Sequence, residues 1–294
     1  MKQGIIICAY GKRGYGFGAY HLAYSIKHYC KDYPIYLYCE ERTISQLFPE
    51  DLKIFDKIII FNDRDYKRNG IPDVATMKVQ VLKNSPFDET LYLDADCVCV
   101  SDIKEVMEKF TKGESYFYID VQGKGNKGDE IVYDAWSKHD VAYPFFGLDD
   151  EDVFYSTNSS WFYFKNGLEL SELYGWMLHY LNKSYPMTEL KNKWIKGMLP
   201  DELLWSGVIS KLKINCDGFK LMYYGNTYES IVDVRERHPF ITYYGRVSSG
   251  VNLVKPIWLE FMAKHVKAIH KIDGVPFKYN LEYSYYDKAL NNNQ

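Results

Sequence analysis

The amino-acid sequence predicts an α/β fold in which helices flank a mainly parallel sheet. In the first half of the 294-residue chain, short apolar runs alternate with segments whose apolar residues recur at helical spacing. Three of the expected strands end in stretches that are polar or rich in glycine. Because ligands bind beyond the carboxyl ends of parallel strands, we expect the functional site at this edge of the sheet.

Four apolar runs and two segments of helical spacing make up the first half. The expected strands cover residues 5–9, 35–39, 57–61 and 90–93. The expected helices cover residues 19–31, after a glycine-rich turn, and 74–83. Pro86 follows the second of these helices and ends it, because proline lacks the amide donor that a helix needs.

The second half of the chain is less regular. The expected helices cover residues 102–110, 168–181 and 255–271, and the expected strands cover 115–121, 161–164 and 241–244. Pro200 opens a further helix, because proline is tolerated in a first turn and the acidic residues after it suit the helix dipole. The glycine- and lysine-rich stretch 122–129 is expected to be a loop.

The composition excludes several classes of protein. Aromatic residues make up 17% of the chain and include 28 tyrosines, which excludes a disordered chain. The net charge of −3 argues against binding of nucleic acid through general electrostatic attraction. No apolar run is long enough to span a membrane, and the first run ends in glycines, so we expect a strand there and no signal peptide. The six cysteines show no CxxC spacing, which favours reduced thiols and a cytoplasmic protein.

The sharpest motif is a pair of carboxylates at the end of the predicted strand 90–93. Asp94 and Asp96, separated by Ala95, interrupt an otherwise apolar run. Burying carboxylates without compensation is costly, and one divalent cation would satisfy both. Hard cations such as Mg²⁺ and Mn²⁺ take oxygen ligands and bridge to phosphates. We therefore predict a metal site at Asp94 and Asp96; the alternative is a solvated strand end with capping aspartates.

Asp94-Ala95-Asp96 resembles the DxD motif of GT-A glycosyltransferases, and the chain is most similar to glycosyltransferase family 8. Further stretches resemble that family in the same order along the chain: Tyr15 to Ile26, Thr76 to Lys78, Thr157 to Ser160, Asp201 to Leu204, and Tyr244 to Trp258. The resemblance implies a GT-A fold and a transferase that moves a sugar from a nucleotide-diphosphate sugar, a UDP-hexose foremost. It also implies retention of anomeric configuration and Mn²⁺ or Mg²⁺ as the cofactor.

Several side chains are candidates for holding the nucleotide. Tyr10 and Tyr15 flank the glycine-rich turn and are expected to stack on the nucleobase; the resemblance favours Tyr15. Asp63 is expected to accept a hydrogen bond from the base. Lys78 and Lys255 are expected to contact the diphosphate. The alternatives are loop packing for the tyrosines, a turn cap for the aspartate and a solvated surface charge for Lys78.

The candidate catalytic residues are four polar side chains from the second half of the chain: Asp120, Asn158, Asp201 and Glu202. Asp201 and Glu202 are expected to bind the hydroxyls of the donor sugar or to stabilise its cationic transition state. Asp120 is a candidate for binding the acceptor. Glu202 replaces the glutamine that is usual in the family, which adds a negative charge near the reacting sugar.

The third metal ligand is where the chain departs from the family. The family places a histidine just before its closing glycine, and Tyr243 or Tyr244 stands there in this chain. His238 is the nearest histidine, so it is the predicted third ligand; the alternative is a surface histidine before Pro239.

The resemblance predicts one GT-A domain over 1–294, with a nucleotide-sugar half (1–121), an acceptor half (122–258) and a C-terminal helical tail (259–294). Two other functions stay open: a nucleotidyltransferase with a similar sheet, and a non-catalytic sugar-binding module. The sequence does not identify the acceptor, which could be a saccharide, a glycolipid, a protein or a modified DNA base. It does not give the oligomeric state either.

Overall fold

The computed structural model describes residues 2–10, 15–45, 47–126, 139–185, 199–216, 219–224 and 236–242. The described residues fall into two compact units that interleave along the chain. Unit 1 takes its residues from 62–91 and 112–219, with Lys2, and unit 2 takes its residues from 3–61, 92–111 and 220–242. The halves expected from the sequence, 1–121 and 122–258, stay a prediction. The expected helical tail and the helix over 255–271 lie outside the described residues.

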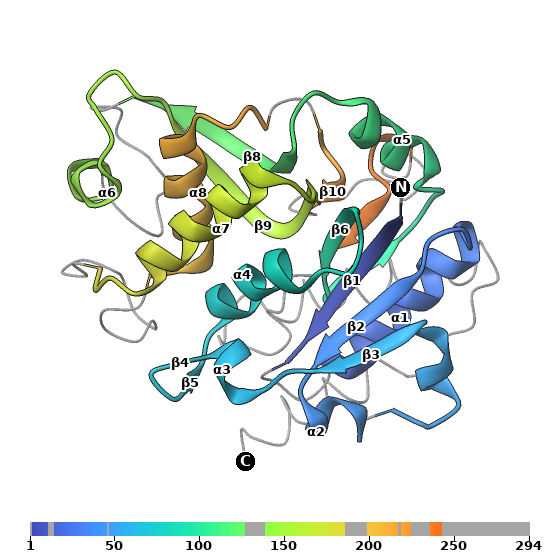
Figure 1. Ribbon diagram of the computed structural model, residues 1–294. Coiled ribbons are helices and arrows are strands. Elements are labelled where there is room, and N and C mark those ends of the chain that lie inside the picture. Colours follow the sequence, from blue (N-terminus) through green and yellow to red (C-terminus); the bar gives the residue numbers. More distant parts are fainter. Residues whose placement is uncertain are drawn as a thin grey trace, which may run out of the picture. The chain divides into compact units, whose positions relative to one another are not determined.

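Unit 2 is built on parallel strands in the order β3-β2-β1 (Figure 1). Strand β1 (Gln3–Ala9) pairs in parallel with β2 (Ile35–Cys39), which pairs in parallel with β3 (Lys57–Ile60). Helix α1 (Tyr15–Tyr29) packs against β1. The shorter helices are α2 (Glu41–Ile44), the 3₁₀ helix η1 (Asp51–Ile54) and α5 (Lys104–Lys112).

A second, three-stranded sheet lies in unit 2, in the order β10-β11-β7. Strand β11 (Phe240–Thr242) pairs in parallel with β10 (Met222–Tyr223) and antiparallel with β7 (Cys97–Cys99). Helix α1 also packs against β7. The backbone amide of Cys99 donates to Ser25 of α1 at 3.0 Å, which ties that helix to the strand.

Unit 1 combines five helices with two antiparallel strand pairs among its described residues. Strand β4 (Lys67–Arg68) pairs with β5 (Ile71–Pro72), and β8 (Phe117–Gly125) pairs with β9 (Phe154–Lys165). Its helices are α3 (Asp63–Tyr66), α4 (Val74–Asn84), α6 (His139–Phe146), α7 (Leu168–Leu181) and α8 (Asp201–Leu212). Helix α8 packs on strand β9 (Figure 1). Three further helices, α4, α6 and α7, pack on α8.

Strand β6 (Glu89–Asp94) begins in unit 1 and ends in unit 2. Both units thus present sheet strands with helices packed against them. The predicted α/β class, a largely parallel sheet flanked by helices, is confirmed.

The predicted strands of the first half coincide with β1, β2, β3 and β6 to within a residue or two at each end. The prediction of a loop over 122–129 is wrong in its first part, because β8 continues to Gly125. Pairing with β9 supplies the backbone hydrogen bonds there, and two shifts of register accommodate the irregular sequence. The six cysteines are buried, and none of them is in a disulfide. None of the described helices has the length and apolar character needed to cross a membrane.

Aromatic side chains form the centre of unit 1. The ring of Trp205, on α8, stacks on Phe117 of β8 with centroids 5.4 Å apart and planes 11° apart. It also lies 4.8 Å from the ring of Phe162 on β9. All three side chains are completely buried, so the aromatic excess of the sequence is used here to hold α8 on the strand pair.

The packing of α6 against α8 can be tested at Gly207. A β-carbon added there would overlap the ring of Phe146, which is completely buried. We expect Gly207→Ala to lower the free energy of unfolding by about 1–3 kcal/mol. Gly175→Ala, on α7, is the matched control because nothing lies within 4 Å of its added β-carbon, and it should raise stability by up to about 1 kcal/mol. Urea unfolding of both variants measures this, and equal shifts would contradict the packing.

Candidate active site

The carboxylate pair lies in unit 2, on the turn that leads from β6 into β7. Ala95 is buried, whereas Asp94 and Asp96 on either side of it are partly exposed. A small residue thus anchors the turn while the carboxylates on both sides reach the surface. The hydroxyl of Thr242, on β11, donates to the backbone oxygen of Asp96 at 3.3 Å and ties the turn to the three-stranded sheet.

Tyr92 fixes one carboxylate of the pair. Its hydroxyl donates to Oδ1 of Asp94 at 2.5 Å. Burial raises the pKa of Tyr92 well above its ordinary value, and the negative charge of Asp94 raises it further. Tyr92 therefore stays protonated and acts as the donor, and its hydrogen bond fixes the orientation of the Asp94 side chain.

The chemistry of this turn fits a hard divalent cation. Carboxylate oxygens are the ligands that Mg²⁺ and Mn²⁺ prefer, and two partly exposed carboxylates on a fixed turn offer them without further burial of charge. Among the described residues, no group of three or more histidine, cysteine, aspartate or glutamate side chains gathers there or elsewhere. A cation would therefore be held by Asp94 and Asp96 within the part of the chain that the structure describes.

His238 does not lie with the two aspartates. The antiparallel register of β11 and β7 sets Thr242 opposite Cys97, and the amide of Val100 donates to the oxygen of Pro239 at 2.8 Å. His238 thus lies at the far end of β7 from Asp96, and its Nδ1 is 3.1 Å from the backbone oxygen of Lys220. The register argues against His238 as the third ligand. Tyr243 and Tyr244 lie outside the described residues.

The expected nucleotide contacts divide between the two units. Tyr10 follows β1 in unit 2, is partly exposed and lies near enough to Tyr92 to raise its pKa slightly. Tyr15 is the first residue of α1 and is also partly exposed. Asp63 is the first residue of α3 in unit 1. Lys255 lies outside the described residues.

Lys78 is buried inside unit 1 and is not a solvated helix residue. It lies on α4, which Asp73 caps by accepting the amide of Thr76 at 3.0 Å. The ammonium of Lys78 donates to the backbone oxygen and the hydroxyl of Ser159 on β9, and to Oδ2 of Asp201 on α8, each at 3.0 Å. These three bonds match the three donors of an ammonium group.

Asp201 and Glu202 form the first turn of α8 and differ in their surroundings. Asp201 is buried, and its Oδ2 also accepts the hydroxyl of Ser159 at 2.8 Å. Burial opposes ionisation of Asp201, but the charge of Lys78 and the hydrogen bonds to its carboxyl outweigh it, so its pKa is lowered. Glu202 is partly exposed as a residue, and its carboxyl is partly desolvated. That desolvation, then the charge of Asp201 and a hydrogen bond to it, raises the pKa of Glu202 well above its ordinary value.

Asp120 and Asn158 form a second polar pair in unit 1. They are cross-strand partners on β8 and β9. Asp120 is buried and accepts from Nε2 of Gln122 at 2.7 Å, and Oδ1 of Asn158 accepts the amide of Ser160 at 2.9 Å. Because Ser159 points to α8 and neighbouring strand residues point to opposite faces, Asn158 lies on the other face of β9 from Asp201.

Comparison with known proteins identifies the fold of the chain. No protein-family model and no curated protein matches the chain. Among solved structures, the chain is similar to the galactosyltransferase LgtC in complex with donor and acceptor sugar analogues, with a TM-score of 0.53 at 11% identity over 95% of this chain and 98% of that one. The chain has the fold of a glycosyltransferase.

Two further glycosyltransferases share this fold. The bifunctional WbbM matches with a TM-score of 0.55 at 12% identity, over 92% of this chain and 51% of that one. The apo form of GlyE from Streptococcus pneumoniae TIGR4 matches with a TM-score of 0.51 at 12% identity, over 92% of this chain and 63% of that one. The GT-A expectation for the fold is therefore confirmed.

Two side chains that hold the candidate site residues, Tyr92 and Ser159, were missed from the sequence. Tyr92 stands two residues before Asp94, so both side chains point to the same face of a strand, and this spacing was the available signal. Ser159 stands beside the candidate Asn158, but only the long-range packing of α4 and α8 against β9 shows that it binds Asp201.

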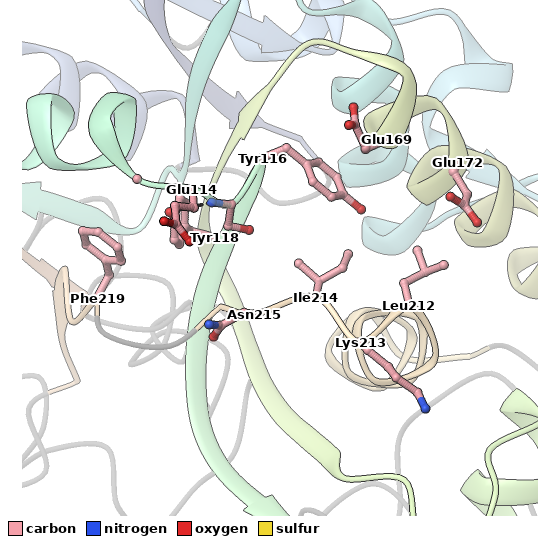
Figure 2. Close-up of a pocket in the computed structure, with 12 residues that line it drawn as sticks. Glu114, Tyr116, Tyr118, Glu169, Glu172, Leu212, Lys213, Ile214, Asn215 and Phe219 are labelled. Carbon is pink, nitrogen blue, oxygen red and sulfur yellow. Dashed lines mark hydrogen bonds between the residues drawn. The ribbon is translucent and has the colours of Figure 1, made fainter.

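A separate pocket of about 570 Å³ opens at the other end of α8 in unit 1 (Figure 2). Tyr116 lies between Glu169 and Glu172 of α7 on one side and Ile214 on the other. Burial raises the pKa of Tyr116 to about 12, with the charge of Glu172 contributing next. None of the site residues predicted from the sequence lines this pocket.

The Lys78–Asp201 pair can be tested by removing its cation. Lys78→Met leaves Asp201 buried without compensation, and we expect it to lower the free energy of unfolding by about 3–5 kcal/mol. Lys27→Met is the control, because Lys27 pairs at 3.0 Å with Asp56, whose side chain is 45% exposed; the expected loss there is about 0–1 kcal/mol. Urea unfolding at neutral pH measures both, and equal losses would contradict a buried, structural pair.

Proposed function

We propose that the protein is a metal-dependent glycosyltransferase that moves a sugar from a nucleotide-diphosphate sugar, a UDP-hexose foremost, to an acceptor with retention of configuration. The observation that carries the proposal is the carboxylate pair on the turn after β6, in a chain that has the fold of a glycosyltransferase. Retention comes from the family resemblance. The galactosyltransferase among the structural neighbours is consistent with a hexose donor.

Asp94 and Asp96 hold the metal in this proposal, and Tyr92 keeps Asp94 oriented. The bound Mn²⁺ or Mg²⁺ supplies Lewis-acid stabilisation of the charge that develops on the leaving diphosphate. Tyr10 or Tyr15 offers an aromatic face for the nucleobase, since both side chains are partly exposed. On the sequence alone, we also propose that Asp63 accepts a hydrogen bond from the base and that Lys255 contacts the diphosphate.

Asp201 and Glu202 bind the donor sugar in this proposal. Glu202 is the more accessible of the two, because Asp201 is buried against Lys78 and Ser159. Lys78 therefore acts on the sugar through Asp201, in addition to or in place of the diphosphate contact expected from the sequence. Asp120 is the proposed acceptor contact, and Asn158 stays a catalytic candidate from the sequence. The acceptor is a saccharide, a glycolipid, a protein or a modified DNA base.

Loss of the metal-binding carboxylate should abolish turnover of the donor. We expect the wild-type protein with Mn²⁺ to release UDP from UDP-glucose or UDP-galactose, and Asp96→Asn to lower that rate by about 10²-fold or more, because it removes a preorganised electrostatic contact. Asp102→Asn is the matched control: it removes the same charge from unit 2, and an asparagine can still accept the amide of Lys104 as Asp102 does at 2.9 Å.

The same assay separates the other candidate functions. A nucleotidyltransferase would release pyrophosphate from a nucleoside triphosphate and no UDP from a UDP-sugar. A sugar-binding module would release neither, and its affinity would survive Asp96→Asn. Absence of UDP and of free sugar, with binding unchanged in Asp96→Asn, overturns the glycosyltransferase proposal.

A further inference from the structure

We propose that the pocket at the C-terminal end of α8 binds an uncharged disaccharide or trisaccharide, at a site separate from the two carboxylate pairs. Every described residue that lines this pocket belongs to unit 1, and none of them is a candidate for the transfer reaction. The inference goes beyond the proposed function, because it concerns binding alone and needs neither a nucleotide-sugar nor a metal.

Strand alternation brings two tyrosines to one side of β8. Phe117 points to the other side, where its ring stacks on Trp205 in the core of unit 1. Because neighbouring residues of a strand point to opposite faces, Tyr116 and Tyr118 both point away from that stack, and both line the pocket. The buried ring of Tyr118 lies against that of Phe219, with centroids 4.8 Å and planes 68° apart. This aromatic wall is therefore held in place by the protein itself.

Tyr116 offers both a ring and a hydroxyl to the pocket (Figure 2). Its side chain is half-buried, and its hydroxyl forms no hydrogen bond with another described residue. Burial raises the pKa of Tyr116 to about 12, so the hydroxyl keeps its proton at neutral pH and can donate. The C–H groups of a sugar ring pack on such an aromatic face, while the phenol beside them reaches a ring or hydroxyl oxygen.

The pocket has the size of a site for a small organic ligand. It holds about 570 Å³, which is more than a single sugar ring fills and lies in the usual range of ligand sites. Across the pocket from Tyr116 lie Ile214 and Leu212 (Figure 2). A ligand between them therefore meets apolar groups on both sides, as the C–H faces of a saccharide require.

Carboxylates lie on both sides of Tyr116. Glu169 and Glu172 of α7 lie on one side, and Glu114 lies on the other, near Tyr118 (Figure 2). All three glutamates are exposed, and none of them forms an ion pair with a described residue. Carboxylate oxygens accept hydrogen bonds, so they match the hydroxyl groups of a saccharide, which donate them.

The charges of the lining argue against an anionic ligand such as a nucleotide or a phosphorylated sugar. Lys213 is the basic residue of the described lining, and its ammonium lies 2.9 Å from Oδ1 of Asp152, which is not part of the lining. The three carboxylates therefore repel anions. A single cation would need them at one point, whereas they are spread along the aromatic wall. That spread fits a chain of sugar rings with hydroxyls along its length.

Direct binding to the full chain, without UDP-sugar and without metal, tests the inference. The probes are lactose, maltotriose and cellotriose at millimolar concentration, detected by saturation-transfer NMR and measured by calorimetry. We expect at least one of them to bind. Tyr116→Ala should raise its Kd about tenfold, because it removes the stacking face. Tyr116→Phe keeps the ring and its packing, and should raise the Kd about threefold through loss of one hydrogen bond.

Tyr155→Ala is the matched control. Tyr155 is another partly exposed tyrosine of unit 1, but it does not line the pocket, so this variant should leave the Kd unchanged. Binding of none of the three saccharides overturns the inference, and so does a Kd that neither Tyr116 variant changes. Tighter binding of spermidine than of every saccharide, lost in Glu172→Gln, makes this a site for cations and overturns the inference as well.

This inference and the proposed function fail separately. A protein that binds a probe saccharide through Tyr116 but releases no UDP from a UDP-sugar loses the proposed function and keeps the saccharide site. An active enzyme whose pocket binds no saccharide keeps the proposed function and loses the saccharide site.

Discussion

The ion pair between Lys78 and Asp201 is the interaction on which the candidate site of unit 1 depends. It joins α4 to α8 and, through Ser159, joins both helices to β9. Taking two charges out of water is costly, and only close geometry with further hydrogen bonds compensates for it. A buried pair that is satisfied in this way fixes the start of α8, and with it the orientation of Asp201 and Glu202.

In both units, hydrogen bonds from neighbouring side chains hold one carboxyl of an acidic pair in place. In unit 2 the hydroxyl of Tyr92 holds Asp94 in place. In unit 1 Lys78 and Ser159 hold Asp201, and among the described residues the adjacent Glu202 forms no ion pair. Each carboxyl pair therefore has one member that is fixed by the protein, which reduces the ordering cost when a ligand binds.

The sequence predicted the α/β class and the strands that lead to the site, because a buried strand followed by polar residues is a local pattern. It also singled out Asp94 and Asp96 from their position at a strand end, and Asp201 and Glu202 from the family resemblance. It did not predict what Lys78 binds, because its partners are 81 and 123 residues away along the chain. The register of β11 on β7, which separates His238 from Asp96, likewise depends on tertiary pairing that no local pattern contains.

The most direct measurement of the central claim is a double-mutant cycle on the Lys78–Asp201 pair, in which Lys78→Met, Asp201→Asn and the double variant are unfolded in urea. We predict that the double variant loses about 1–3 kcal/mol less stability than the sum of the two single losses, because removing both partners leaves no buried charge uncompensated. Single losses that simply add up in the double variant would contradict the account.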